Sequence, residues 1–167
     1  TKVGAETTGS HNNDPEEIYK VLSEIAKKRG RNIEDIIIES VAELLDPESR
    51  VEIYKKLHEK YLQEAEDLYR KNDLPQAGEK YWGSLIALLN VVGEKEKLPH
   101  YTHRDLREIA EFLTKKTNDP EFSRLFSSAE ALHANFYHNF MSRLSFDAHR
   151  EDLLKLVRKI KEYLGSR

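Results

Sequence analysis

The chain has 167 residues, 34% of which are charged, and it contains one tryptophan and no cysteine. This length suits one domain of ordinary size. Because cysteine is absent, the sequence excludes a disulfide framework, a thiolate nucleophile and a cysteine-based zinc site. The formal net charge of −3 provides no overall field that would attract nucleic acid or an anionic membrane.

No apolar stretch is long enough to span a bilayer. The longest run, 85–89, falls far short of the roughly 20 residues that a membrane helix needs. No charged start followed by an apolar core resembles a secretory signal. We therefore expect a cytoplasmic protein without a membrane partner. The single methionine and the many charges of both signs fit the composition of a thermophile's protein, although they also fit a mesophile's.

The N-terminal part of the chain predicts a tail followed by two helices. Residues 1–13 contain two glycines and no apolar period, which is typical of a disordered tail or an expression remnant. A proline at the first helical position and Gly30 as a stop signal predict a helix over 15–29. Asn32 is placed to cap a second helix over 33–45. We interpret 14–46 as a two-helix extension.

The remaining residues, 47–167, predict a string of helices with short connections. Periodic apolar positions indicate helices over 47–72 and 74–95, then over 102–116, from 121 to about 140, and over 147–164. The helix over 74–95 has almost no polar face and should be central. No segment alternates with the period of a strand. The predicted fold class is all-α, an antiparallel up-and-down helical bundle of about five helices with a two-helix N-terminal extension.

One predicted helix carries a row of chemically useful side chains. Glu130 and His133 could both reach one metal ion, but a di-iron bundle needs a second such pair and none occurs, so we expect no metal. His133 and His138 diverge by about 140° around a regular helix and cannot share a ligand. Glu130, His133 and Tyr137 lie along one edge, which predicts either a polar ligand pocket or an interhelical hydrogen-bond cluster.

A second group of polar side chains gathers at a predicted helix N-terminus, where free N–H groups and the helix dipole favour anions. His100, His103 and Arg104 lie there, which would suit a bound phosphate. Thr102 and Asp105 have the spacing of a capping box and would satisfy the same N–H groups. Both interpretations stay open. Glycine-rich phosphate loops are absent from the sequence, and we expect no cofactor.

Three sequence blocks resemble one protein family. They are QAGEKYWG at 76–83, LPHYTHRDL at 98–106 and AEALHANFY at 129–137. In this order and spacing, within 65–164, they are similar to the archaeal PaREP family. That family is placed among the HEPN-like helical bundles, a group that includes substrate-binding domains of nucleotidyltransferases. The resemblance implies a bundle that often forms homodimers, and some relatives bind nucleotides, partner a minimal nucleotidyltransferase or cleave RNA.

The HEPN proteins that cleave RNA share a short sequence motif. Cleaving HEPN proteins carry an arginine followed, a few residues later, by a histidine just before the last helix. His133 and His138 occupy that place here, so the arginine that would stabilise transition-state charge is missing. Arg143 and His149 fit the motif's spacing but lie later in the chain. The motif therefore does not favour a ribonuclease.

The N-terminal helices carry a separate resemblance. Residues 25–41 are similar to the two helices of a ribbon-helix-helix protein, which reads DNA with a preceding strand. The preceding stretch here, 7–13, is polar and has no strand pattern. We therefore expect no DNA binding and assign the extension to packing or dimerisation.

The preferred prediction is a non-catalytic, dimeric, HEPN-like module that binds a nucleotide, RNA or a partner protein. Its predicted ligand-binding residues are the edge Glu130, His133 and Tyr137 and the corner His100, His103 and Arg104. One alternative is a metal-independent ribonuclease that acts through Arg143 and His149 or through His133 and His138. Another is an antitoxin-like partner of a minimal nucleotidyltransferase. Enzymatic activity stays open, with binding preferred.

Overall fold

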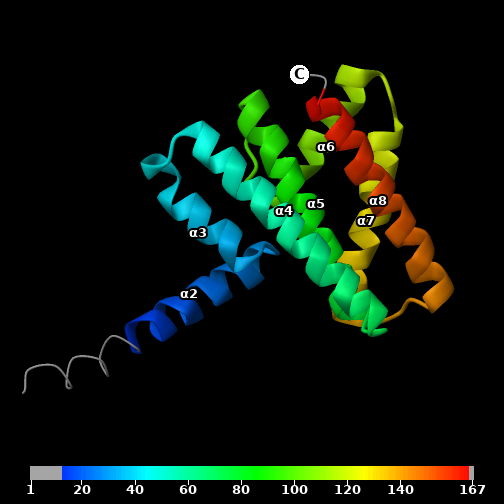
Figure 1. The fold of residues 1–167 in the computed structure, drawn as a ribbon, viewed down its shortest axis with the longest axis horizontal. Helices are drawn as coiled ribbons and strands as arrows, with labels where there is room; N and C mark the ends of the chain where they lie inside the picture. Colours follow the sequence, from blue (N-terminus) through cyan, green and yellow to red (C-terminus); the bar gives the residue numbers. More distant parts are fainter. Residues whose placement is uncertain (1–12, 166–167) are drawn as a thin grey trace, which may run out of the picture. The chain divides into compact units, whose positions relative to one another are not determined.

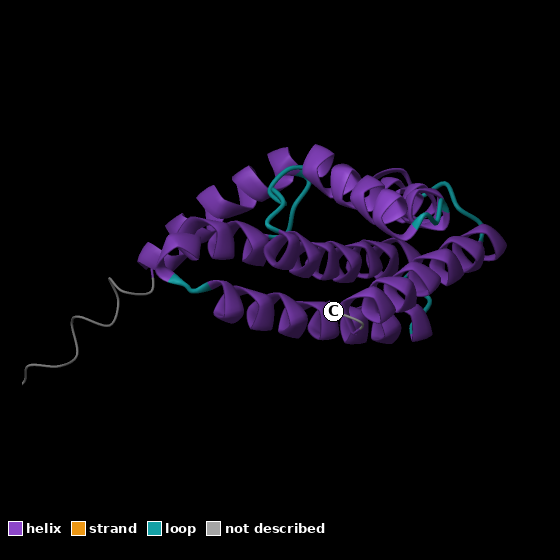
Figure 2. Ribbon diagram, turned by 90° about the horizontal axis from the view of Figure 1, so that it is seen from above, coloured by secondary structure: helices purple, strands orange, loops and turns teal. Residues whose placement is uncertain are grey.

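The computed structural model describes residues 13–165, and these residues are helical apart from short connections (Figures 1 and 2). Seven α-helices and one short 3-10 helix occur among them, and no strand does. The all-α class is confirmed. The tail predicted for residues 1–13 lies outside the described residues except for Asn13. None of the described helices combines the length and apolarity that a membrane crossing requires.

The chain divides into two compact units, Thr1–Leu44 and Leu45–Arg167. Within the described part of the first unit, α2 spans Asn13–Arg29, α3 spans Ile33–Val41, and the 3-10 helix η1 spans Ala42–Leu44. Gly30, which has φ of 62°, ends α2 as predicted. A left-handed residue at this position favours glycine because glycine has no Cβ to clash.

Three details of the first unit differ from the prediction. The first helix already includes Asn13, whereas the tail was predicted to reach that residue. Asn32 occupies the N-cap position of α3 but makes no side-chain cap, because its side chain is hydrogen-bonded to Asp35 instead. The second predicted helix, over 33–45, ends as an α-helix at Val41 and tightens into η1. Such 3-10 turns are frequent at helix ends.

The second unit contains the remaining helices. They are α4 (Pro47–Arg70), α5 (Leu74–Glu96), α6 (His103–Thr117), α7 (Glu121–His138) and α8 (Arg143–Gly165). The predicted start signals are confirmed for α4, where Asp46 accepts a hydrogen bond from the Ser49 backbone at 2.7 Å. They are also confirmed for α6, where Thr102 and Asp105 form the full capping box.

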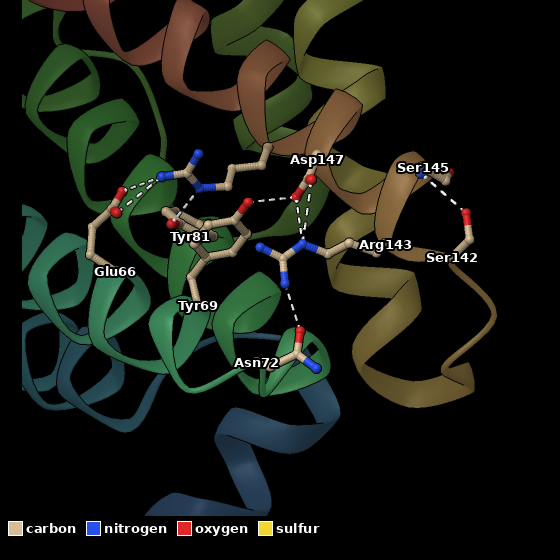
Figure 3. A network of polar contacts seen from close by, with 9 residues as sticks. Glu66, Tyr69, Asn72, Tyr81, Ser142, Arg143, Ser145 and Asp147 are labelled. Carbon is tan, nitrogen blue, oxygen red and sulfur yellow. Dashed lines mark hydrogen bonds and ion pairs between the residues drawn. The ribbon is translucent and has the colours of Figure 1, made fainter.

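Helix α8 begins four residues before the predicted start at Asp147. The Ser142 hydroxyl accepts a hydrogen bond from the backbone N–H of Ser145 at 3.2 Å, which caps the additional turn (Figure 3). Phe146 in this turn is fully buried. The sequence prediction missed the turn because it followed the apolar period of the later residues and overlooked Ser142 as a cap.

Helix α5 is central, as predicted. Every residue from Tyr81 to Gly93 is buried, and α5 contacts α4, α6, α7 and α8. A helix that is apolar around its whole circumference needs neighbours on all sides. Small residues let these neighbours approach: a Cβ added at Gly78 would lie 3.1 Å from Phe146 of α8 and 3.3 Å from the backbone of Leu132 in α7.

In the second unit, the chain reverses direction after four helices at residues other than glycine that have a left-handed backbone conformation. They follow α4, α5, α6 and α7 and are Asn72, Lys97, Asn118 and Asn139, with φ between 45° and 61°. Asparagine tolerates this conformation better than most residues that carry a side chain. Each helix therefore ends through its own local signal.

Gly93, in the last turns of α5, makes room for the imidazole of His100. A Cβ at this position would meet His100 Nδ1 at 2.7 Å and its Cβ and Cγ at 2.9 Å. The imidazole cannot move away easily, because Nδ1 donates to the Leu98 carbonyl at 2.9 Å and Nε2 lies 3.0 Å from Glu94 Oε1. The loop between α5 and α6 therefore packs closely against Gly93.

We expect Gly93→Ala to lower the free energy of unfolding by about 1–2 kcal/mol, because the overlap with His100 outweighs the better helix propensity of alanine. Urea unfolding followed by circular dichroism measures the change. Gly165→Ala is the matched control, since a Cβ there meets nothing within 4 Å. Equal stability of the two variants would contradict this account of the loop.

Candidate functional site

Trp82, on α5, lies at the centre of the candidate site and is almost completely buried. Two imidazoles stack against its indole: His103, from the first turn of α6, at a centroid distance of 5.7 Å, and His133, from α7, at 5.5 Å. Phe126 of α7 packs on the same indole at 5.5 Å. The packing therefore brings together histidines from two helices that flank α5.

Each imidazole pairs with a carboxylate from another helix. His133 Nδ1 donates to Glu79 Oε2 on α5 at 2.8 Å, and His103 Nε2 donates to Glu130 Oε2 on α7 at 2.8 Å. Arg107 of α6 donates to the same oxygen of Glu130 at 2.8 Å. We call this set the indole–imidazole cluster: Glu79, Trp82, His103, Arg107, Glu130 and His133.

The carboxylates determine what the two imidazoles offer to a ligand. A carboxylate accepts hydrogen bonds, so the paired nitrogen carries the proton and, in a neutral imidazole, the other nitrogen is an acceptor. That second nitrogen is Nε2 in His133 and Nδ1 in His103, and neither makes a hydrogen bond to any described residue. Both side chains keep some solvent exposure. The cluster is therefore rich in hydrogen-bond acceptors.

Tyr137 forms the outer edge of the cluster. Its ring meets the His133 imidazole edge-on at 5.3 Å, while 52% of the residue stays exposed. Partial burial, together with the charge of Glu79, raises the pKa of its hydroxyl, so it stays protonated at neutral pH. Tyr137 thus adds an exposed aromatic face and one hydroxyl to the cluster.

A buried donor inside the cluster is left without a protein partner. Trp82 Nε1 is inaccessible to solvent and makes no hydrogen bond to any residue that the structure describes. A buried N–H without a partner costs about 1–3 kcal/mol. Such a group needs an explanation in a native structure, and a water or ligand atom that reaches the indole edge would supply one.

The structure brings together only some of the predicted ligand-binding residues. Glu130, His133, Tyr137 and His103 all belong to or border the cluster, although Glu130 and His133 pair across helices and not with each other. Arg104 is exposed and pairs with Glu108 along the same helix.

His100 is buried in a different place. Glu94 lies between His100 and Arg50, with Glu94 Oε1 3.0 Å from His100 Nε2 and Glu94 Oε2 2.9 Å from Arg50 Nε. The corner of His100, His103 and Arg104 is therefore split, and the capping box occupies the helix N-terminus between them.

Neither of the residue pairs considered for RNA cleavage, Arg143 with His149 and His133 with His138, is in contact in the structure. Figure 3 shows the Arg143 guanidinium beside Asn72 and Asp147, with hydrogen bonds of 2.6 and 3.1 Å. His149, on another side of α8, donates through Nδ1 to the Ser128 carbonyl at 2.9 Å. His138 is exposed at the end of α7, and no contact within the described residues joins it to His133.

In the described part of the chain, no group of three or more histidine, aspartate and glutamate side chains lies close enough together to hold a metal ion. The four acid and imidazole groups of the indole–imidazole cluster are arranged as two separate pairs.

Sequence reasoning missed Glu79, Trp82 and Arg107 as members of the site. Glu79 and Trp82 are three positions apart on α5, so they share a face, and both lie in the first block of the family resemblance. Their link to the edge residues of α7 comes from tertiary packing. Only contact with the later helices assigns Glu79 to His133.

Comparison with known proteins bears on the same region. Residues 53–157 match the archaeal PaREP1/PaREP8 family. The chain belongs to this family. The match includes every residue of the indole–imidazole cluster, and the family resemblance is confirmed. A protein from Sulfolobus solfataricus, known from a crystal structure, is similar with a TM-score of 0.58 and 26% identity, over 65% of this chain and 96% of that one. No curated protein matches this PaREP1/PaREP8 chain.

We expect His133→Ala to expose the indole of Trp82 to water and to lower stability by about 1–2 kcal/mol, through the lost ring contact and the unpaired Glu79. Because Trp82 is the single tryptophan, the emission maximum of the protein should shift to longer wavelength. His138→Ala, at the exposed end of the same helix, is the control and should leave the spectrum unchanged. An unshifted spectrum in His133→Ala would show that His133 does not cover the indole.

Proposed function

We propose that this PaREP1/PaREP8 protein is a non-catalytic binding module that recognises the base of a nucleotide or of single-stranded RNA at the indole–imidazole cluster. The observation that carries the proposal is the pair of imidazoles on Trp82. Each is fixed by a carboxylate, and the second nitrogen of each has no hydrogen-bond partner in the described part of the chain. As part of the same proposal, we place the chain among the HEPN-like bundles, with five helices after a two-helix extension. We also propose that the protein is cytoplasmic and comes from a thermophile.

The chemistry of the cluster favours a base over a phosphate. Glu79 and Glu130 would repel an anion, and Arg107 offsets only part of that charge. The same carboxylates and the free imidazole nitrogens accept hydrogen bonds, as the exocyclic amino groups of adenine, cytosine and guanine require. The exposed ring of Tyr137 can stack on a base, which is the usual way that proteins hold unpaired bases.

We expect AMP, GMP and CMP to raise the melting temperature more than UMP, because uracil has no amino group to donate to the cluster. A thermal-shift assay measures this, and Trp82 emission provides a second readout of binding. His133→Ala should weaken binding about tenfold in affinity, whereas Arg104→Ala should not, since the exposed Arg104 pairs with Glu108 outside the cluster. If none of the four nucleotides shifts the wild-type protein, the proposal is wrong.

A ribonuclease is the second candidate, and one contact favours it. The Glu79 carboxylate fixes the His133 tautomer and leaves Nε2 as an acceptor, which is the arrangement of a histidine general base. Incubation with a mixed RNA pool in EDTA distinguishes the two functions. Cleavage that disappears in His133→Ala, while His149→Ala stays active, would overturn the non-catalytic proposal.

The module is proposed to work as a homodimer. Phe140 and Leu144 are large, exposed and close together in sequence at the connection between α7 and α8, with 61% of Phe140 and 84% of Leu144 accessible. The buried Asn135 accepts hydrogen bonds from the backbones of Phe140 and Met141, each at 2.8 Å. The connection is therefore held in one conformation, which supports its use as a contact surface.

We expect sedimentation at micromolar concentration to give a dimer for the wild-type protein and a monomer for Phe140→Ser, because the substitution removes an exposed apolar contact from the proposed interface. Arg104→Ala, remote from the connection in sequence and already exposed, should stay dimeric. A wild-type monomer would contradict this assembly, and it would leave the nucleotide proposal standing.

A further inference from the structure

A cavity of about 310 Å³ lies between α4, α5 and α8 and shares no residue with the indole–imidazole cluster. Its wall carries three lysines, one from each helix, and a single carboxylate, that of Glu59. The lysines are Lys55, Lys95 and Lys161. In a protein with a formal net charge of −3, this surplus of positive charge is local to the cavity.

His58 lines the same cavity and is 98% buried, with only 2% of its surface exposed. Its Nδ1 donates to the Ser84 carbonyl of α5 at 2.8 Å. The opposite nitrogen, Nε2, is buried and makes no hydrogen bond to any described residue. Burial, followed by the charge of Lys161, lowers the pKa of His58 despite the opposing effects of Ser84 and Glu59. The imidazole is therefore neutral at pH 7, and Nε2 is an unused acceptor.

The carboxylate of Glu59 shows where an anionic oxygen sits in this cavity. Glu59 Oε1 lies 3.8 Å from His58 Nε2 and 3.3 Å from Lys161 Nζ. The side chain of Glu59 is 67% exposed, so it can swing into solvent at small cost. Another oxyanion that entered the cavity would find the same two groups.

The other lysines can hold further oxygens of such a ligand. Lys95 has no carboxylate partner among the described residues, and Lys55 makes only a 3.8 Å contact with Glu52. Apolar contacts come from Leu88 and Leu164, which line the cavity beside the charged groups. A volume of about 310 Å³ is at the low end for ligand pockets, which limits the occupant to a small molecule.

We propose that this cavity binds a small phosphate monoester, whose oxygens take the place of the Glu59 carboxylate beside His58 and Lys161. The charge of three lysines suits a dianion. A carbon skeleton the size of a pentose contacts Leu88 and Leu164. The site is separate from the proposed base-binding function and does not depend on it.

The bound dianion makes the cavity a proton-coupled site. Negative charge next to His58 raises its pKa, so Nε2 becomes protonated and its N–H donates a hydrogen bond to a phosphate oxygen. Glu59 and Lys161 are the charged groups that act on this imidazole, and Lys55 and Lys95 line the same cavity. Displacement of Glu59 leaves the phosphate as the anionic neighbour of Nε2. Affinity therefore rises as the pH falls from 8 to 7, by at most about tenfold for one proton.

Calorimetry with ribose 5-phosphate as the probe tests the site, with ribose as the uncharged comparison. We expect binding of ribose 5-phosphate and none of ribose. Lys95→Gln should weaken binding about five- to tenfold without a change in the melting temperature, because Lys95 makes no ion pair with any residue that the structure describes. Lys116→Gln, an exposed lysine of α6 outside the cavity, should bind like the wild type. Equal affinities of these two variants, or binding of ribose, would overturn the proposal.

A separate experiment tests whether His58 takes up the proton. Asparagine at this position keeps a donor for the Ser84 carbonyl but cannot take up a proton, so His58→Asn should retain the fold. Binding heats in buffers of different ionisation enthalpy should reveal net proton uptake by the wild type and less uptake by His58→Asn. Equal uptake would show that His58 is not the proton acceptor. His133→Ala should bind ribose 5-phosphate unchanged, which separates a failure of this site from a failure of base binding.

Discussion

The burial of α5 on all sides is the constraint on which the second unit depends. A helix without a polar face must be covered by neighbours around its whole circumference, and here four helices supply that cover. The glycines of α5 set how closely those neighbours approach, with Phe146 and Leu132 against Gly78 and the imidazole of His100 against Gly93. Small residues in the most buried helix therefore determine where the surrounding side chains can lie.

Four histidines from the neighbouring helices and loop reach α5, and each meets a polar atom or ring on it. His58 donates to the Ser84 carbonyl, His100 lies against Glu94, His103 stacks on Trp82, and His133 pairs with Glu79. An imidazole can pack against an apolar helix with its ring and still satisfy a nitrogen at the edge. This repeated arrangement explains how four histidines of the second unit can lie against its most apolar element.

The arrangement also separates two kinds of chemistry. On the side of α6 and α7, carboxylates accompany the histidines and the surroundings accept hydrogen bonds. On the side of α4 and α8, lysines accompany the histidine and the surroundings attract anions. A buried helix between them keeps these opposite electrostatic environments apart, because each is formed by different neighbours.

Much of the fold could be predicted from sequence, because its signals are local. The apolar period, the capping box of Thr102 and Asp105, and the stop at Gly30 specify elements without reference to the rest of the chain. The start of α8 was missed because Ser142 is a weak signal beside a strong apolar period.

The site was predicted less well than the fold because its partners are distant in sequence. The edge of Glu130, His133 and Tyr137 follows from helical geometry alone. The pairing of His133 with Glu79, 54 positions away, and of Glu130 with His103, 27 away, depends on how helices pack. For the same reason His100 and Arg104, neighbours of His103 in sequence, point to other partners. The helical period predicts which residues lie on one face of a helix, but it does not predict which residues of other helices pack against that face.

The left-handed residues that end α4, α5, α6 and α7 affect the unfolded chain as well as the native one. Glycine would adopt their conformation without strain, but it would also give the unfolded chain more states to lose on folding. Asparagine at three of these positions narrows that ensemble while still permitting the turn. The connections therefore carry a bias toward reversing direction before any helix has packed, so the long hairpin of α4 and α5 can form from adjacent sequence. That hairpin contains α5, the helix that α6, α7 and α8 also contact in the second unit.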